Sequence, residues 1–250
     1  MHSPFATRRW MIIHIFAAIV VMTCLALAAW QFDRLQTRKA DNHRLLEQAR
    51  LPAADLQEAF GAGSDSVSLD RAAYRRLETS GTYDVSEEVL LRSRSQEGRP
   101  GHHLLTPLLT GSGTALIVDR GWIPMEIDEP GTAQTAPPEG RVRVAGLLLQ
   151  SEKKGFLGIS DPPPGRVSSL PRVDLDRLGE QLPYEVVPLY LRLQDQQPPN
   201  PGELPEPVPI PEPDDGPHLS YALQWLFFAV AASVAYAGLI RKERRALAGS

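Results

Sequence analysis

Two long apolar segments, one near each end of the chain, restrict how it can fold. Residues 10–32 contain no formal charge over 23 positions, about 34 Å as a helix, which is enough to cross a hydrocarbon core of roughly 30 Å. Residues 218–240 form a second uncharged segment, with Tyr221 and Trp225 near one end and Tyr236 near the other. Aromatic side chains in those places are typical of membrane interfaces. We therefore predict two transmembrane helices, 10–32 and 218–240.

The first segment also has features of a cleavable signal peptide. Arg8 and Arg9 form a basic start, and Ala26-Leu27-Ala28 fits a small-x-small cleavage site. The apolar run is longer than a usual signal-peptide core, however, and a helical pattern continues beyond it to about Arg50, where Pro52 ends it. We expect a retained transmembrane helix and keep the signal peptide as the alternative.

Basic residues beside the second segment predict the orientation. Four follow it at once, whereas no Lys or Arg lies between Arg192 and residue 218; the four are Arg241, Lys242, Arg244 and Arg245. The positive-inside rule places this end in the cytoplasm, and two spans then place the N-terminus there too. Because abundant Arg, Ala and Pro indicate a GC-rich bacterial genome, we predict a bacterial cell-membrane protein. Residues 1–9 and 241–250 are its cytoplasmic tails, and 33–217 lie outside the cytoplasm.

Residues 33–197 have the pattern of a strand-rich domain. Short apolar runs separated by turn signals occur at residues 88–92, 103–109, 114–120, 141–150 and 186–193. Gly111-Ser112-Gly113 indicates a hairpin between the second and third runs, and residues 45–50 and 174–182 have a helical pattern. The expected fold is an extracytoplasmic α+β domain with a small antiparallel sheet or barrel, flanked by the two transmembrane helices.

A proline-rich strap joins this domain to the second helix. Nine of the 20 residues from Pro198 to Pro217 are proline, which favours extended polyproline structure and removes backbone donors. We interpret residues 198–217 as a semi-rigid connection, with an SH3-type ligand as the alternative.

Composition and motifs exclude several classes of function. The net charge of −4 gives no basic face for nucleic acid. Cys24 is the single cysteine and lies in the first apolar segment, so no disulfide framework or thiolate metal site is expected. No catalytic motif occurs in a suitable local context. We therefore do not expect an enzyme.

Two histidines lie in or beside the predicted spans. His14 is inside the first span, where a polar side chain is a functional candidate by default, although it can also snorkel to the interface. His218 begins the second span and shares a helical face with Tyr221 and Trp225 and with several alanines. A flat apolar ring with a central metal could lie there, its iron on His218. The alternative is an interfacial histidine beside an ordinary aromatic belt. His102 and His103, at a strand entrance, are expected to be solvated or turn residues.

Five runs of residues together resemble the surfeit locus protein 1 family, membrane proteins that help to assemble haem-copper cytochrome oxidases. They are AAWQFDRLQTRK from Ala28, YRRLETSGTYD from Tyr74, PGHHLLTPL from Pro100, IVDRGWIP from Ile117 and HLSYALQWLFF from His218. The runs follow the family's order over nearly the whole chain, with a span at each end.

The resemblance implies a function and a set of site residues. It implies maturation of oxidase subunit I, with contacts to other respiratory-complex subunits, and transient binding of haem a through the histidine that matches His218. Tyr221 and Trp225 would flank the macrocycle. The family's Trp-Gln pair and following arginine match Trp30, Gln31 and Arg34, and its Arg-Gly-Trp matches Arg120, Gly121 and Trp122. Residues 155–182 and the proline strap match nothing in the family pattern.

For these matched residues we expect structural roles first. Trp30 and Arg34, four residues apart, can stack as ring and cation, and Gly121 is expected to permit a turn. The alternative to a haem carrier is a cofactor-free scaffold or accessory subunit that stabilises oxidase subunits or a respiratory supercomplex. A membrane sensor is a weaker alternative, because tails of about ten residues leave no room for an output domain.

Overall fold

The structure, a computed structural model, describes residues 7–60, 66–111, 113–152, 165–210 and 212–248. The chain divides into two compact units. The first contains residues Met1–His43 and Pro213–Ser250, and the second contains Arg44–Glu212. Each unit is described separately below.

Two long helices form the first unit, α1 (Arg8–Arg50) and α5 (His218–Ala248); the last turns of α1 belong to the second unit. Both helices are long and apolar enough to cross a membrane. Only 11% and 6% of their most apolar windows are buried, so neither is the core helix of a globular domain. As predicted, the first helix continues past the apolar segment and ends at Arg50.

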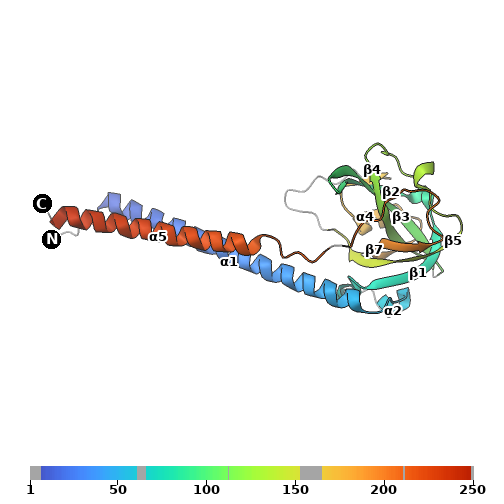
Figure 1. Ribbon diagram of the computed structural model, residues 1–250, viewed down its shortest axis with the longest axis horizontal. Coiled ribbons are helices and arrows are strands. Elements are labelled where there is room, and N and C mark those ends of the chain that lie inside the picture. The colour runs from blue at the N-terminus through green and yellow to red at the C-terminus, as the bar shows by residue number, and fades with distance from the viewer. Residues whose placement is uncertain (1–6, 61–65, 112, 153–164, 211, 249–250) are drawn as a thin grey trace. The chain divides into compact units, whose positions relative to one another are not determined.

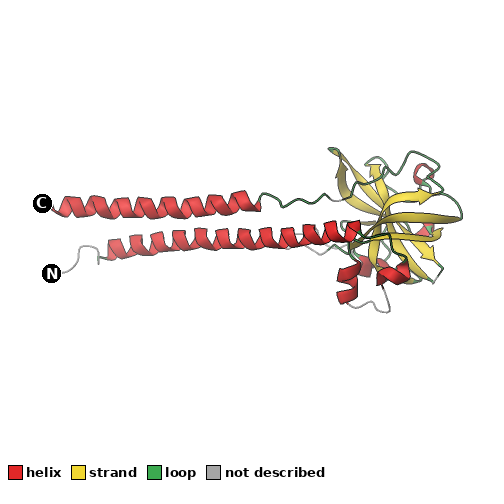
Figure 2. Cartoon of the chain, turned by 60° about the horizontal axis from the view of Figure 1, so that its bottom comes forward, coloured by secondary structure: helices red, strands yellow, loops and turns green. Residues whose placement is uncertain are grey.

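The two helices run alongside each other in opposite directions (Figure 2). Buried positions along the middle of α1 and on α5 are spaced by four or seven residues, which marks one face of each helix: Cys24, Ala28 and Leu35 on α1, and Ala222 and Ala229 on α5. This spacing is that of a narrow helix-pairing seam. Trp10 and Leu45, nearer the two ends of α1, are buried as well. Small residues make up much of the seam, and large apolar side chains point outward from both helices, as expected for helices surrounded by lipid.

The second unit is built around a seven-stranded mixed sheet (Figure 1). Its strands are β1 (Arg76–Tyr83), β2 (Val89–Gln96), β3 (Arg99–Thr110), β4 (Thr114–Pro124), β5 (Arg141–Gln150), β6 (Ser169–Leu170) and β7 (Glu185–Gln197). Two short helices, α2 (Leu56–Phe60) and α3 (Ser66–Ala72), precede the first strand. The helix α4 (Leu175–Gly179) and the 3-10 turns Val85–Glu87 and Ala133–Thr135 lie between strands.

Strand pairing closes five of the strands into a barrel. The sheet order is β1-β5-β7-β4-β3-β2-β6, and β1 also pairs with β3, which completes the ring. Gly81 lies at the closure, opposite both Val142 of β5 and Thr110 of β3. A Cβ atom there would stand 2.4 Å from the Leu109 carbonyl oxygen, so the two neighbouring backbones can approach only a glycine. Three apolar clusters fill the domain, and the two larger ones include Leu148 and Leu147, respectively.

The five predicted apolar runs lie in strands, apart from Glu88, which directly precedes β2. The hairpin between β3 and β4 is confirmed, although Ser112 is outside the described residues. The predicted helix at 174–182 corresponds to α4. Two features differ. The sheet is mixed, not antiparallel, because β4 pairs parallel to β7 and β2 parallel to β6. β1 was also not expected, since only Leu77 and Tyr83 among its eight residues are large and apolar.

Candidate functional site

His218 stands at the first position of α5 and makes a hydrogen bond to the other helix of its unit. Its Nδ1 atom lies 2.8 Å from Oε1 of Gln31 on α1. The loop before it is tied to the same helix, because the Asn42 amide donates to the Asp215 carboxylate over 2.9 Å. Two residues predicted from separate runs, Gln31 and His218, are therefore brought together although 187 positions separate them.

Of the aromatic residues predicted beside His218, Tyr221 lies on the exposed side of α5, whereas Trp225 lies nearer the seam. Tyr221 is 47% exposed, and the half-buried Trp225 packs edge-on against Phe228, with ring centroids 5.8 Å apart. Ala222 and Ala229, which the helical spacing placed on the same face, are buried in the seam. The surface left for a flat ligand next to His218 is thus the one with Tyr221 and Trp225.

Trp30 and Arg34 lie next to this site on α1. The Arg34 guanidinium carbon is 5.9 Å from the centre of the Trp30 ring, which is the predicted stacking of cation and ring. Trp30 is 52% exposed. A half-exposed indole beside a charge suits the boundary between membrane and water.

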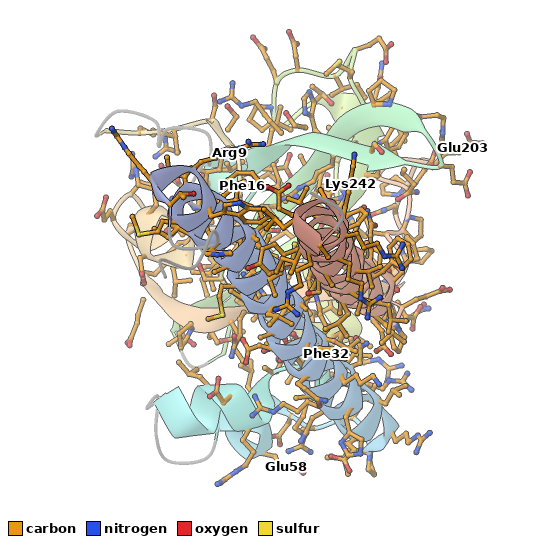
Figure 3. All side chains as sticks on the ribbon, turned by 90° about the vertical axis from the view of Figure 1, so that its left-hand side faces the viewer. Arg9, Phe16, Phe32, Glu58, Glu203 and Lys242 are labelled. Atoms are coloured by element: carbon orange, nitrogen blue, oxygen red, sulfur yellow. The ribbon has the colours of Figure 1, made fainter. Side chains whose placement is uncertain are left out.

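At the other end of the helix pair, His14 contacts α5. Its Nδ1 atom is hydrogen-bonded to the Tyr236 hydroxyl, and its ring packs edge-on against the tyrosine. The side chain is therefore engaged within the pair, where a hydrogen bond between helices fixes their register. Figure 3 views the pair from this end, where Arg9 and Lys242 also lie.

The second family-like motif, Arg120-Gly121-Trp122, lies on β4 in the other unit. Arg120 is buried and pairs with Glu88 over 3.1 Å, while its other amino group donates to Asn200. Glu88 also accepts from the Thr106 hydroxyl and the Gly131 backbone N–H. Burial lowers the pKa of Arg120, and the Glu88 carboxylate opposes that shift. The charge pair thus links β4 to β3, to the start of β2, to the loop at Gly131 and to the strap, while Nε of Arg120 is buried without a hydrogen-bond partner among the described residues.

Gly121 and Trp122 hold the proline strap. The backbone of Trp122 exchanges two hydrogen bonds with Glu206, of 2.7 and 2.8 Å. At Gly121, φ is 141° and a Cβ would stand 2.3 Å from the Glu206 carbonyl oxygen, so the strap requires a glycine here. Gly121 lies within β4, where the expected turn is absent. The strap also does more than connect, because Glu206 supplies a backbone donor between two prolines.

A side-chain clamp reinforces this contact. The Arg99 guanidinium donates to both carboxylate oxygens of Glu206, at 3.0 and 2.6 Å, and stacks over the Trp122 ring at 4.4 Å. The hydrogen bond from Arg99 lowers the pKa of Glu206 and raises that of Arg99. The conformation of the strap at Glu206 is therefore fixed by backbone, charge and ring together.

His102 and His103 are not the solvated residues expected. Both are buried within β3, and burial lowers the pKa of His102. His103 Nδ1 lies 3.0 Å from the buried Asp119 carboxylate, which Arg192 also approaches at 3.4 Å. The sequence pattern predicted only that the two histidines stand where a strand begins. Their burial could not be predicted, because the bulge and the pairing with β4 that bury the two rings depend on distant residues.

The arrangement suits a single axial ligand better than a metal cluster. Among the residues that the structure describes, no three His, Cys, Asp or Glu side chains gather into a metal-binding group. A haem iron accepts a neutral imidazole nitrogen as its axial ligand. His218 offers Nε2 for this role, with a glycine in the preceding turn and aromatic side chains nearby. The described site residues thus fit the group that the resemblance implies.

Comparison with known proteins identifies the family. The family model described as "SURF1 family" matches residues 18–230, which include every site residue named above from Trp30 to Trp225. The chain belongs to the SURF1 family. A SURF1-like protein of Mycobacterium bovis, described as uncharacterised, is 28% identical over 96% of this chain and 88% of its own length.

Other SURF1 relatives come from distant organisms. A SURF1-like protein of Dictyostelium discoideum is 24% identical over 90% of this chain and 94% of its own length. The human surfeit locus protein 1 is 25% identical over 54% of this chain and 49% of its own length. These matches confirm, at the level of the family, the resemblance inferred from five sequence runs. The SURF1 family is known for the assembly of cytochrome oxidase.

Proposed function

We propose that this SURF1 protein is an assembly factor for a haem-copper cytochrome oxidase, which binds haem a through His218 and delivers it to subunit I. The observation that carries the proposal is the imidazole at the head of α5, whose Nδ1 bonds to Gln31 and whose other nitrogen is left as a ligand atom. Haem a is the cargo in this proposal, and the protein is a carrier without catalysis of its own.

The surroundings of His218 support binding of a large flat cargo. Beside His218, Tyr221 offers an exposed ring and Trp225 a half-buried one, and a ligand on the Tyr221 side can enter and leave sideways within the membrane. One axial histidine suits transfer, since two would hold the iron more firmly.

The proposed location is the bacterial cell membrane, with both termini in the cytoplasm and the barrel outside it. Two apolar helices in opposite directions support this topology, because the basic residues near Arg9 and Lys242 then meet at one end of the pair (Figure 3). α1 also continues unbroken through Ala26–Ala28, and Ala28 is buried in the seam. Retention of the first helix is thus part of the proposal.

The test is the haem content of the protein purified in detergent from cells that make haem a. We expect a pyridine haemochrome of haem a in the wild type, its loss in His218→Ala, and its retention in His43→Ala, which removes an exposed imidazole of α1. Equal haem content in His218→Ala and wild type would overturn the assignment.

The alternative is a cofactor-free scaffold for oxidase subunits. The Arg120-Gly121-Trp122 motif favours this reading of the barrel, because all three residues serve the folding of the domain and its strap. A scaffold predicts copurification with oxidase subunits without Soret absorbance in any variant, so the same preparation decides between the two functions.

A further inference from the structure

We propose that Gln31 is a positioning residue that holds His218 as the Nδ1–H tautomer and so leaves Nε2 as the ligand atom, while Gly216 keeps that edge of the ring open. This inference deepens the proposed function and rests on it for the identity of the ligand. The tautomer itself can be measured without any ligand.

The hydrogen bond between the two side chains assigns the proton. Nδ1 of His218 faces Oε1 of Gln31 at 2.8 Å, and an amide oxygen can only accept. The proton therefore lies on Nδ1, and the lone pair of the neutral ring lies on Nε2. In proteins, the partner of one ring nitrogen decides which nitrogen can bind a metal.

Gln31 is itself held in place by its position on α1. It follows Ala28 by three residues and precedes Leu35 by four, and both of these are buried in the seam. Asn42, eleven residues further on, faces the same way after three turns and bonds to Asp215. The loop that begins α5 is thus fixed to one face of α1 at two points, with the imidazole at one of them.

Gly216 determines how much room the Nε2 edge has. Its φ is +66°, and a Cβ built on it would stand 3.3 Å from Cδ2 and 3.5 Å from Nε2 of His218. A methyl group there would occupy the space next to the ligand atom that a macrocycle needs. The turn that requires positive φ is supported by a 2.8 Å bond from the Gly216 N–H to Asp214.

The consequence for ligand binding follows from the chemistry of imidazole. An acceptor at Nδ1–H orients the ring and makes Nε2 a stronger electron donor to a metal. Loss of such a partner typically costs on the order of 10–100-fold in metal affinity. A stronger acceptor, the carboxylate of a glutamate, should donate still more electron density through the ring.

The first test uses apoprotein labelled with ¹⁵N-histidine in detergent, with the His218 signals assigned by comparison with His218→Ala. We expect Nδ1 protonated in the wild type and in the control Gln224→Leu, which changes an exposed glutamine of α5. Gln31→Leu should lose this preference. A wild-type His218 protonated on Nε2, or no change in Gln31→Leu, would overturn the positioning role, whether or not the protein binds haem.

The second test uses haemin as the probe. Gln31→Leu should bind it about tenfold more weakly and shift the midpoint potential upward, while Gln31→Glu should restore binding and shift the potential downward. A purely structural role for Gln31 would not give opposite shifts, so equal potentials in the two variants contradict the proposal.

Gly216→Ala should also weaken haemin binding but keep the Nδ1–H tautomer. Gly140→Ala controls for the strain of positive φ, since φ there is +77° and a Cβ would meet nothing within 4 Å. Equal losses in both alanine variants would overturn the role of Gly216. Absence of haemin binding in the wild type would overturn the carrier function, and the ¹⁵N result would still decide the role of Gln31.

Discussion

Arg120 and Glu88 bring two opposite charges into the interior of the barrel, where neither side chain is more than 1% exposed. A buried pair of this kind adds little over an apolar pair, but removal of one partner leaves the other charge without compensation. Loss of either side chain would therefore leave the other as a buried, unpaired charge.

We predict that Glu88→Gln lowers the free energy of unfolding of the barrel domain by about 3–5 kcal/mol. Urea unfolding of the full-length protein in detergent measures this. Glu185→Gln, at an exposed position of β7, is the control and should change stability little. The double variant Glu88→Gln, Arg120→Met should lose less than the sum of the single changes. Strict additivity would show that the pair is not coupled.

Docking of the strap on β4 depends on pH through Glu206. Because the hydrogen bond from Arg99 lowers the pKa of this carboxylate below its ordinary 4.5, the clamp stabilises the docked strap above that pH and is lost as the pH falls through the lowered value. The protection factors of the Glu206 and Trp122 amides, which compare the observed exchange rate with the intrinsic rate at the same pH, should therefore fall in acid. Glu206→Gln should show no such fall, and a wild-type profile as flat as that of the variant would contradict the prediction.

At the scale of elements, the strap and β4 form a single structure because of Gly121. Gly121→Ala places a methyl group against the Glu206 carbonyl in a backbone conformation that alanine rarely adopts. We expect loss of the two hydrogen bonds between Trp122 and Glu206, measured as loss of exchange protection at both amides. Gly140→Ala, at a glycine that also has a positive φ but has nothing within 4 Å of an added Cβ, should keep that protection.

Elements also differ in how far sequence could predict them. Stacking of Arg34 on Trp30 was predictable because four residues on a helix fix the distance. Five strands were predictable from apolar runs, whereas β1 was not, since its burial comes from closure of the barrel and its sequence is polar. The parallel pairing of β4 with β7 and the bond from His218 to Gln31 join distant residues, so no local pattern predicted them.

At the scale of the whole molecule, the proposed topology assigns each end of the helix pair to one side of a membrane. We predict that a cysteine at Glu203 in a Cys24→Ser background reacts with a membrane-impermeant maleimide in cells with an opened outer envelope. A cysteine at Ala246 should react only after the inner membrane is permeabilised. Both positions are exposed in the fold. The reverse pattern would refute the orientation, and reaction at both positions would refute two retained spans.

Because the ring of strands is closed by β7, folding of the domain depends on a strand that is synthesised last. β7 lies between β5 and β4, so a nascent chain that ends before residue 185 has two neighbouring strands with open edges and nothing to join them. Exposed strand edges pair with strands of other chains, which leads to aggregation. Until Gln197 has emerged, the growing protein thus depends on being shielded, and a truncation that removes only the strap and the last helix should be tolerated far better than one that also removes β7.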